Sequence, residues 1–163
     1  MYKQLARILM ISLFSIPCLA LDEIEPHKKV IGETANFILA DHAEFVARID
    51  TGAATTSVHA FDFEVEQEDE DMRKNIGKVI YFTLENEEGK QWRTSAIVRD
   101  VTRIKNSQGV ERRYKVPLRV GWDTINKTID VNLRDRSKMK YKLLIGRDWL
   151  EREVVVDLER EAE

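Results

Sequence analysis

One aspartate in this sequence lies where a carboxylate could do chemistry instead of only closing a turn. Asp50 follows an apolar stretch that ends at Ile49, and Thr51, Gly52 and Ala53 come directly after it. An aspartate at the end of a strand often accepts hydrogen bonds from nearby backbone N–H groups. Small and apolar neighbours would also keep this carboxylate partly away from water, a setting typical of catalytic acids. Asp50 is therefore the candidate catalytic residue, and the sequence contains this pattern once.

A second motif, near the C-terminus, has the features of a structural support. An apolar run over residues 143–145 leads into Gly146 and Arg147, and the residues from Arg147 to Glu151 are predicted to form a short helix. Glycine permits the close approach of a second backbone, and a guanidinium can hold a loop through parallel hydrogen bonds. The pairing of the two motifs is more informative than either one alone.

The chain between these motifs is predicted to be almost entirely β-strand. Apolar and polar residues alternate with the period of strands that bury one face. The alternating segments are residues 45–49, 79–84, 116–120 and 129–133. The polar turns between strands are residues 87–89, 106–109 and 121–123. Short strands with polar turns predict an all-β barrel or sandwich, and the acidic run over residues 64–71 is expected to be a solvated loop.

The first residues have the pattern of a secretory signal peptide, predicted to span residues 1–20. Lys3 and Arg7 precede an apolar run over residues 8–16, and small residues before and at Ala20 provide a cleavage site. The apolar run is shorter than the roughly 20 residues that a membrane-spanning helix needs, so we expect no membrane attachment after cleavage. The protein is accordingly predicted to be periplasmic or secreted.

Cleavage would leave a polar leader over residues 21–28 and one domain over residues 29–160. The only cysteine, Cys18, would leave with the signal peptide, so the mature chain would hold no thiol and no disulfide. The net charge of −3 is mixed along the chain, which gives no reason to expect nucleic acid as a partner.

The two motifs, in this order, resemble those of the retropepsin-like aspartic peptidases. In that family an apolar strand ends in Asp-Thr-Gly-Ala, and a later one ends in Gly-Arg-Asp or Gly-Arg-Asn before a short helix. Residues 49–60 are similar, more narrowly, to a stretch of the bacterial group often labelled ATP-dependent zinc proteases. The resemblance covers roughly residues 29–158 and is weakest at the acidic run. It implies a small closed barrel of the retropepsin-like acid-protease type, with one short C-terminal helix, as a peptidase domain over residues 29–160.

The resemblance further implies peptide hydrolysis by a pair of aspartates, without a metal ion or other cofactor. Two like charges about 3 Å apart cannot both ionise, so one carboxyl group polarises the scissile carbonyl while the other activates water. A chain with one Asp-Thr-Gly motif and no internal repeat can obtain the second carboxylate only from another copy. The expected enzyme is a homodimer that uses Asp50 of each subunit and cleaves a protein or peptide.

The supporting residues also take their roles from the resemblance. Thr51 would bond across the two-fold axis, and Gly52 would let backbone approach the carboxylates and the substrate. Ala53 stands where some relatives have serine, so one hydroxyl donor to the carboxylates is missing. Gly146 would let a strand cross behind the catalytic loop, and Arg147 would hold that loop or the dimer interface.

Arg147 needs an acceptor other than the one used in retroviral relatives. In those proteins an aspartate four residues after the catalytic one meets this arginine, but the equivalent position here is Ala54. The expected acceptors are therefore Asp62, Asp157 or backbone carbonyl groups.

Two further segments have expected places in such a fold. Residues 104–114 are the candidate for the hairpin that closes over substrate, although a plain surface hairpin is the alternative. Residues 153–158 would be an exposed edge strand in a single chain and are expected to pair with their symmetry mate. The tryptophans are expected to pack in the core; they are Trp92, Trp122 and Trp149.

Two other functions stay open. A zinc-dependent peptidase would need about three suitably spaced ligands, and the histidines His27, His42 and His59 form no His-x-x-x-His pair. A non-catalytic module could use the same fold to bind an extended peptide by strand addition. Loss of activity with a chelator would favour zinc, and absence of cleavage by a verified dimer would favour the binding module.

Overall fold

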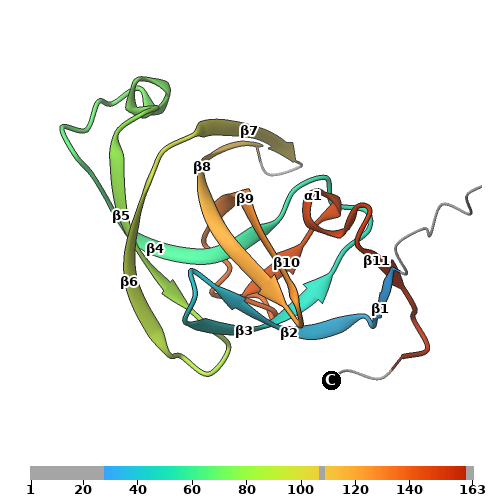
Figure 1. Cartoon of the computed structure of the whole chain (residues 1–163). Helices are drawn as coiled ribbons and strands as arrows, with labels where there is room; N and C mark the ends of the chain where they lie inside the picture. The colour runs from blue at the N-terminus through green and yellow to red at the C-terminus, as the bar shows by residue number, and fades with distance from the viewer. Residues whose placement is uncertain (1–27, 107–108, 161–163) are drawn as a thin grey trace, which may run out of the picture.

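The chain folds mostly into β-strands, with a short α-helix near its C-terminus (Figure 1). The computed structural model describes residues 28–106 and 109–160. The strands are β1 (Lys29–Ile31), β2 (Thr34–Leu39), β3 (Ala43–Ile49), β4 (Ser57–Val65), β5 (Val79–Glu85), β6 (Gln91–Ile97), β7 (Asp100–Asn106), β8 (Gly109–Trp122), β9 (Ile125–Arg134), β10 (Leu143–Ile145) and β11 (Val154–Val156). The helices are the 3₁₀-helix η1 (Met72–Asn75) and the α-helix α1 (Arg147–Leu150). The predicted all-β fold class is confirmed.

The N-terminal predictions concern residues that the structure does not describe. The expected signal peptide, residues 1–20, and the leader up to residue 27 lie outside the described ranges. Within those ranges, no helix has the length and apolar character needed to cross a bilayer.

The strands that carry the two motifs belong to a ring. In order of pairing, the ring consists of β10, β3, β2, β8, β9 and β4, and β4 pairs again with β10. β10 runs parallel to the end of β3 and antiparallel to the start of β4, so it lies between them. The chain from Asp50 to Thr56, which joins β3 to β4, therefore passes around the end of β10. This ring of strands agrees with the predicted small barrel-like architecture.

The core forms where the alternating strands face one another. Burial alternates along β2 and β3, so each strand turns one apolar face inward. Phe37 lies edge-on to Trp149, with ring centroids 4.9 Å apart, and the Trp149 indole N–H donates to the Val120 carbonyl at 3.0 Å. Trp92 and Trp122 pack against the same core, so the prediction for the three tryptophans is confirmed.

β8 is long because it pairs with three strands: Val120 and Gly121 near its end pair with β2, and two longer stretches pair with β9 and with β7. Its second half, from Lys115 onward, pairs with β9, whereas residues 109–115 pair with β7. Residues 100–106 and 109–114, called the arm below, thus form a two-stranded projection that extends past β9. In the view of Figure 1, the end of β7 points toward the side of the molecule on which α1 lies. The candidate closing hairpin falls in this arm, except that residues 107–108 lie outside the described part, and its closing role stays a prediction.

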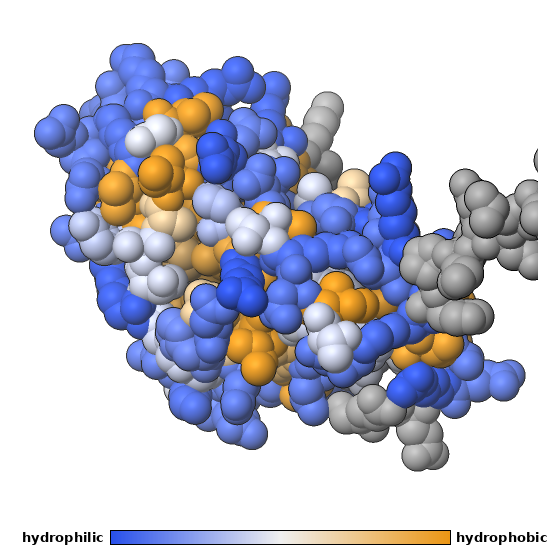
Figure 2. Space-filling view, in the orientation of Figure 1, coloured by the Kyte–Doolittle hydropathy of each residue, from blue (hydrophilic) through white to orange (hydrophobic). Residues whose placement is uncertain are grey.

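The acidic run is solvated, as expected, but it is also folded. Residues 66–78, called the acidic loop below, contain η1 and connect β4 to β5. Most of their acidic side chains are exposed, yet Asn75 is completely buried. The exposed apolar residues nearby include Ile76 and Ile97, and Figure 2 shows an apolar patch among hydrophilic side chains at the upper left of the view.

The C-terminal run forms an edge strand, β11, that already has a partner within the same chain. β11 pairs in parallel with β1 of the same chain, in the register Val30 to Val155. The cause is that β1 returns alongside the chain end: the Lys29 N–H donates to the Glu153 carbonyl at 3.1 Å, and the Asp157 N–H donates to the Ile31 carbonyl at 2.9 Å. Pairing with a symmetry mate could therefore only extend this two-stranded sheet.

Candidate active site

Asp50 is held at the end of β3 by backbone hydrogen bonds. Its N–H donates to the Ile145 carbonyl of β10 at 2.9 Å. Its carboxylate oxygen Oδ1 accepts the Gly52 N–H at 2.9 Å and the Ala53 N–H at 3.1 Å. Two bonds to one oxygen fix the orientation of the carboxyl group. Asp50 is half-buried, and Thr51 and Gly52 next to it are exposed. The loop therefore presents a fixed carboxylate at the molecular surface.

The Gly-Arg segment supports this loop from behind. The Arg147 N–H donates to the Ala53 carbonyl at 2.9 Å, and its Nη1 donates to the carbonyls of Thr51 at 3.1 Å and Gly52 at 3.3 Å. Backbone carbonyls are thus its acceptors, one of the three alternatives that the sequence left open. A Cβ atom on Gly146 would lie 2.6 Å from the Thr55 carbonyl carbon, so the two backbones approach each other closely at this glycine.

Sequence analysis missed a second link between the two motifs, formed by Thr56 and Asp148. The Asp148 carboxylate accepts the Thr56 N–H at 2.9 Å and the Thr56 hydroxyl at 2.7 Å. The Thr56 hydroxyl in turn accepts the Gly146 N–H at 3.1 Å. Both residues lie inside the recognised motifs, but the complete burial of Thr56, which requires a partner for its hydroxyl, is visible only in the structure.

A group of arginines, also missed, lies beside this site. Arg113 and Arg136 are 8% and 5% exposed, and Arg134 ends β9 between them in sequence. Glu111 binds Arg113 at 2.5 and 2.7 Å and lies 3.6 Å from Arg134. Arg136 instead donates to two neutral acceptors, the Tyr141 carbonyl and the Ser57 hydroxyl, each at 3.1 Å.

The charge of Arg136 is only weakly balanced. Burial, together with the positive charges of Arg134 and Arg113, lowers the pKa of its guanidinium to about 10. The negative charge of Asp50 acts in the opposite direction and is the weakest of these influences. Arg136 is therefore a buried cation within the electric field of the candidate catalytic carboxylate.

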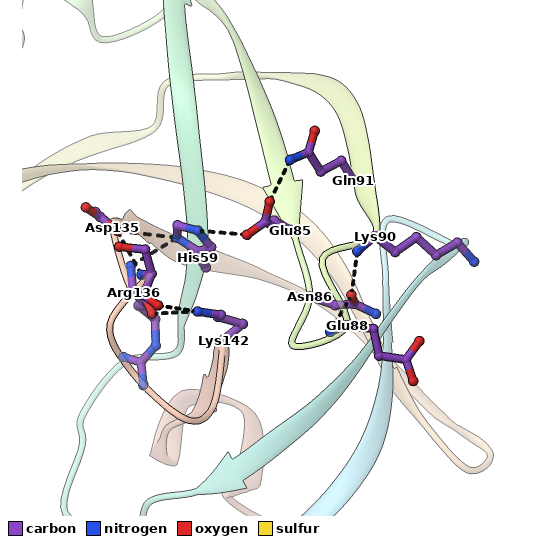
Figure 3. Close-up of polar contacts among 10 residues, drawn as sticks. His59, Glu85, Asn86, Glu88, Lys90, Gln91, Asp135, Arg136 and Lys142 are labelled. Atoms are coloured by element: carbon purple, nitrogen blue, oxygen red, sulfur yellow. Dashed lines mark hydrogen bonds and ion pairs between the residues drawn. The ribbon is translucent and has the colours of Figure 1, made fainter.

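The backbone around Arg136 is fixed by a polar network (Figure 3). The Arg136 N–H donates to His59 Nδ1 at 3.0 Å, and Lys142 Nζ donates to the carbonyls of Arg136 and Ser137 at 3.3 and 2.5 Å. His59 is 3% exposed and stacks on Phe61, so it has a packing role. These bonds hold the Arg136 guanidinium on the inner side of its loop.

Among the described residues, the structure does not bring the histidines considered as zinc ligands together in one site. Within the described ranges, no group of three or more His, Cys, Asp or Glu side chains is placed to hold a metal ion. His42 lies at an exposed turn, and His27 lies outside the described residues.

Comparison with known proteins identifies the family. The family model described as "RimB-like: Retropepsin-like aspartic endopeptidase RimB" matches residues 30–162. The chain therefore belongs to this family and has an aspartic-peptidase type of fold, which confirms the resemblance found in the two motifs. The roles of the individual site residues stay predictions.

Two relatives extend this comparison. A crystal structure of a protein of unknown function from Legionella pneumophila subsp. pneumophila str. Philadelphia 1 is similar, with a TM-score of 0.65 and 26% sequence identity over 82% of this chain and 96% of that chain. A protein of Parasynechococcus marenigrum (strain WH8102) named "Probable alpha-L-glutamate ligase" is 32% identical over 114 residues, 69% of this chain. The match spans only 24% of that protein's length.

Substitution Gly146→Ala should destabilise the fold, because the added methyl group would overlap the Thr55 backbone. Overpacking against backbone typically costs about 1–3 kcal/mol, and urea unfolding monitored by tryptophan fluorescence measures it. Glu151→Ala, at an exposed position just after α1, is the matched control and should change the free energy of unfolding by less than about 0.5 kcal/mol. Equal stability of Gly146→Ala and wild type would contradict the close crossing.

Proposed function

We propose that this protein is an exported aspartic endopeptidase whose catalytic dyad forms across a homodimer from Asp50 of each subunit. The observation that carries the proposal is the fixed, surface-facing Asp50 carboxylate, whose Oδ1 accepts two loop N–H groups. Membership of a family described by aspartic endopeptidase activity supports it. Export rests on the sequence of residues 1–20 alone.

The chemistry follows from bringing two such carboxylates together. Each Asp50 is half of the pair, and a two-fold axis beside the exposed residues Thr51 and Gly52 would place the second half opposite. The pair would share one proton, so that one carboxyl group donates to the scissile carbonyl while the other accepts a proton from water. The roles belong to the pair and not to either subunit.

The terminal sheet is the proposed dimer contact. Val30 and Val155 are 38% and 51% exposed on the β1–β11 pair, and Leu158 beyond it is 72% exposed. Three exposed apolar side chains on and beside one small sheet favour burial against another surface. A second copy of the chain would provide that surface, and it would also provide the second carboxylate of the catalytic pair.

The substrate class that we propose is peptides with acidic side chains. The weakly balanced charge of Arg136, beside Arg113 and Arg134, would attract a carboxylate close to the scissile bond. The match to part of a protein named as a glutamate ligase supports the same class.

Asp50→Asn should abolish hydrolysis while the dimer remains. An amide cannot take the proton of the attacking water, so we expect kcat/KM to fall by about a thousandfold. Cleavage of a peptide mixture, read by mass spectrometry, measures this, and sedimentation velocity checks the dimer.

The same assay separates the alternatives. Wild-type activity should survive a strong chelator and be inhibited by pepstatin. Loss of activity with chelator would support a zinc peptidase, and a verified wild-type dimer that cleaves nothing would support the peptide-binding module.

A chain that ends at Glu153 should become a monomer without activity. It loses β11, so Ile31, now 1% exposed, loses its cover at a cost of about 1.5–3 kcal/mol, and the proposed dimer contact is lost as well. A chain that ends at Arg160 keeps β11 and should sediment like the full-length protein. A dimer formed by the shorter chain would refute this contact.

Arg136→Gln should reduce selectivity for acidic peptides. Comparing kcat/KM for an acidic peptide with that for its neutral isostere on the same enzyme cancels any loss of folded protein. We expect this ratio to fall by about tenfold or more, because a buried charge pair contributes roughly 2 kcal/mol or more, whereas Arg136→Lys should keep part of it. An unchanged ratio would remove Arg136 from substrate selection.

A further inference from the structure

The acidic loop is organised around one side chain. Asn75 is completely buried and uses its amide fully: Oδ1 accepts from the Asp69 N–H at 2.8 Å and Lys78 Nζ at 3.0 Å. Its Nδ2 donates to the Asp69 carbonyl and to the Tyr114 hydroxyl, each at 2.9 Å. Such a satisfied buried polar group fixes the conformation of the segments that it joins.

The bond to Tyr114 connects the loop to the place where β8 changes its partner from β7 to β9. Tyr114 pairs with Val101 of β7 and precedes Lys115, the residue at which β8 begins its pairing with β9. Tyr114 therefore lies at the base of the arm. A second, exposed contact joins Asp71 and Arg112 at 3.9 Å, and contacts of this kind contribute little.

The arm in turn adjoins the candidate active site. Glu111 and Arg113 belong to the arm, and Glu111 lies 3.6 Å from Arg134 at the end of β9. Arg113 and Asp50 both act on the charge of Arg136. A change in the direction of the arm would therefore move charged groups that act on Arg136, the same cation on which Asp50 acts.

We propose that the acidic loop is a brace for the arm, and that Asn75 and Tyr114 are positioning residues that set where the arm lies relative to Asp50. The loop fixes the arm at its base through the buried Asn75–Tyr114 bond and leaves the rest of the arm free to contact substrate. The effect on catalysis rests on the proposed peptidase function, whereas the effect on the arm itself does not.

Tyr114→Phe tests the brace, because it removes one hydroxyl and keeps the ring. Tyr81→Phe is the matched control: the Tyr81 hydroxyl donates to Glu66 Oε1 at 2.9 Å, at the other end of the same loop and away from the arm. Amide hydrogen exchange is measured by mass spectrometry on the full mature chain. In Tyr114→Phe we expect exchange in residues 100–106 and 109–113 to accelerate about two- to tenfold, with β2 and β3 unchanged. Tyr81→Phe should leave the arm unchanged.

Kinetics supply the second readout. If the arm positions substrate, Tyr114→Phe should raise KM several-fold and change kcat less, and Asn75→Ala should have the same pattern with a larger effect. Arm exchange that is unchanged in Tyr114→Phe, or equally fast in both tyrosine variants, would overturn the brace. Faster arm exchange with unchanged KM would overturn the positioning role. If Tyr114→Phe accelerates arm exchange but the wild-type protein has no peptidase activity, the brace is supported and the proposed function is contradicted.

Discussion

The contact between the Asp50 loop and the Gly-Arg-Asp segment is the constraint on which the rest of the site depends. Asp148 accepts both polar hydrogens of Thr56, and Arg147 donates to the carbonyls of Thr51 and Gly52 within the turn. These bonds join residues from opposite ends of the domain, because β10 lies between β3 and β4. The carboxylate is therefore positioned only when the ring of strands is complete, and folding and assembly of the half-site are one event.

The arginine group adds an electrostatic constraint of a different kind. A buried cation without a carboxylate partner is costly to the folded state. In this chain the carboxylate of Glu111 balances the charge of Arg113 and lies near Arg134. Among the described residues, Arg136 has only neutral hydrogen-bond acceptors, and the charge of Asp50 acts on it weakly. A negatively charged substrate would supply the missing charge, so the same arrangement that lowers stability would favour binding at the proposed site.

Local patterns in the sequence identified the residues of short motifs in this site, but they did not reveal the contacts between residues distant in sequence. Asp50, Gly146 and Arg147 could be found because each belongs to a short motif at the end of an apolar strand. The roles of Thr56, Arg136 and Asn75 could not, since each depends on a partner distant in sequence that periodicity does not reveal. The pairing within the terminal sheet was not predicted for the same reason: the short segment at Lys29–Ile31 gives no sign that it pairs with β11.

The central claim, that two copies of Asp50 form one catalytic pair, is tested most directly by mixing wild-type and Asp50→Asn subunits. After exchange of subunits at a fixed total concentration, the peptidase activity is measured as a function of the wild-type fraction. A dyad shared across the dimer predicts that activity follows the square of this fraction, about a quarter at equal amounts. A linear fall, to about half at equal amounts, would show that each chain acts alone and would contradict the account.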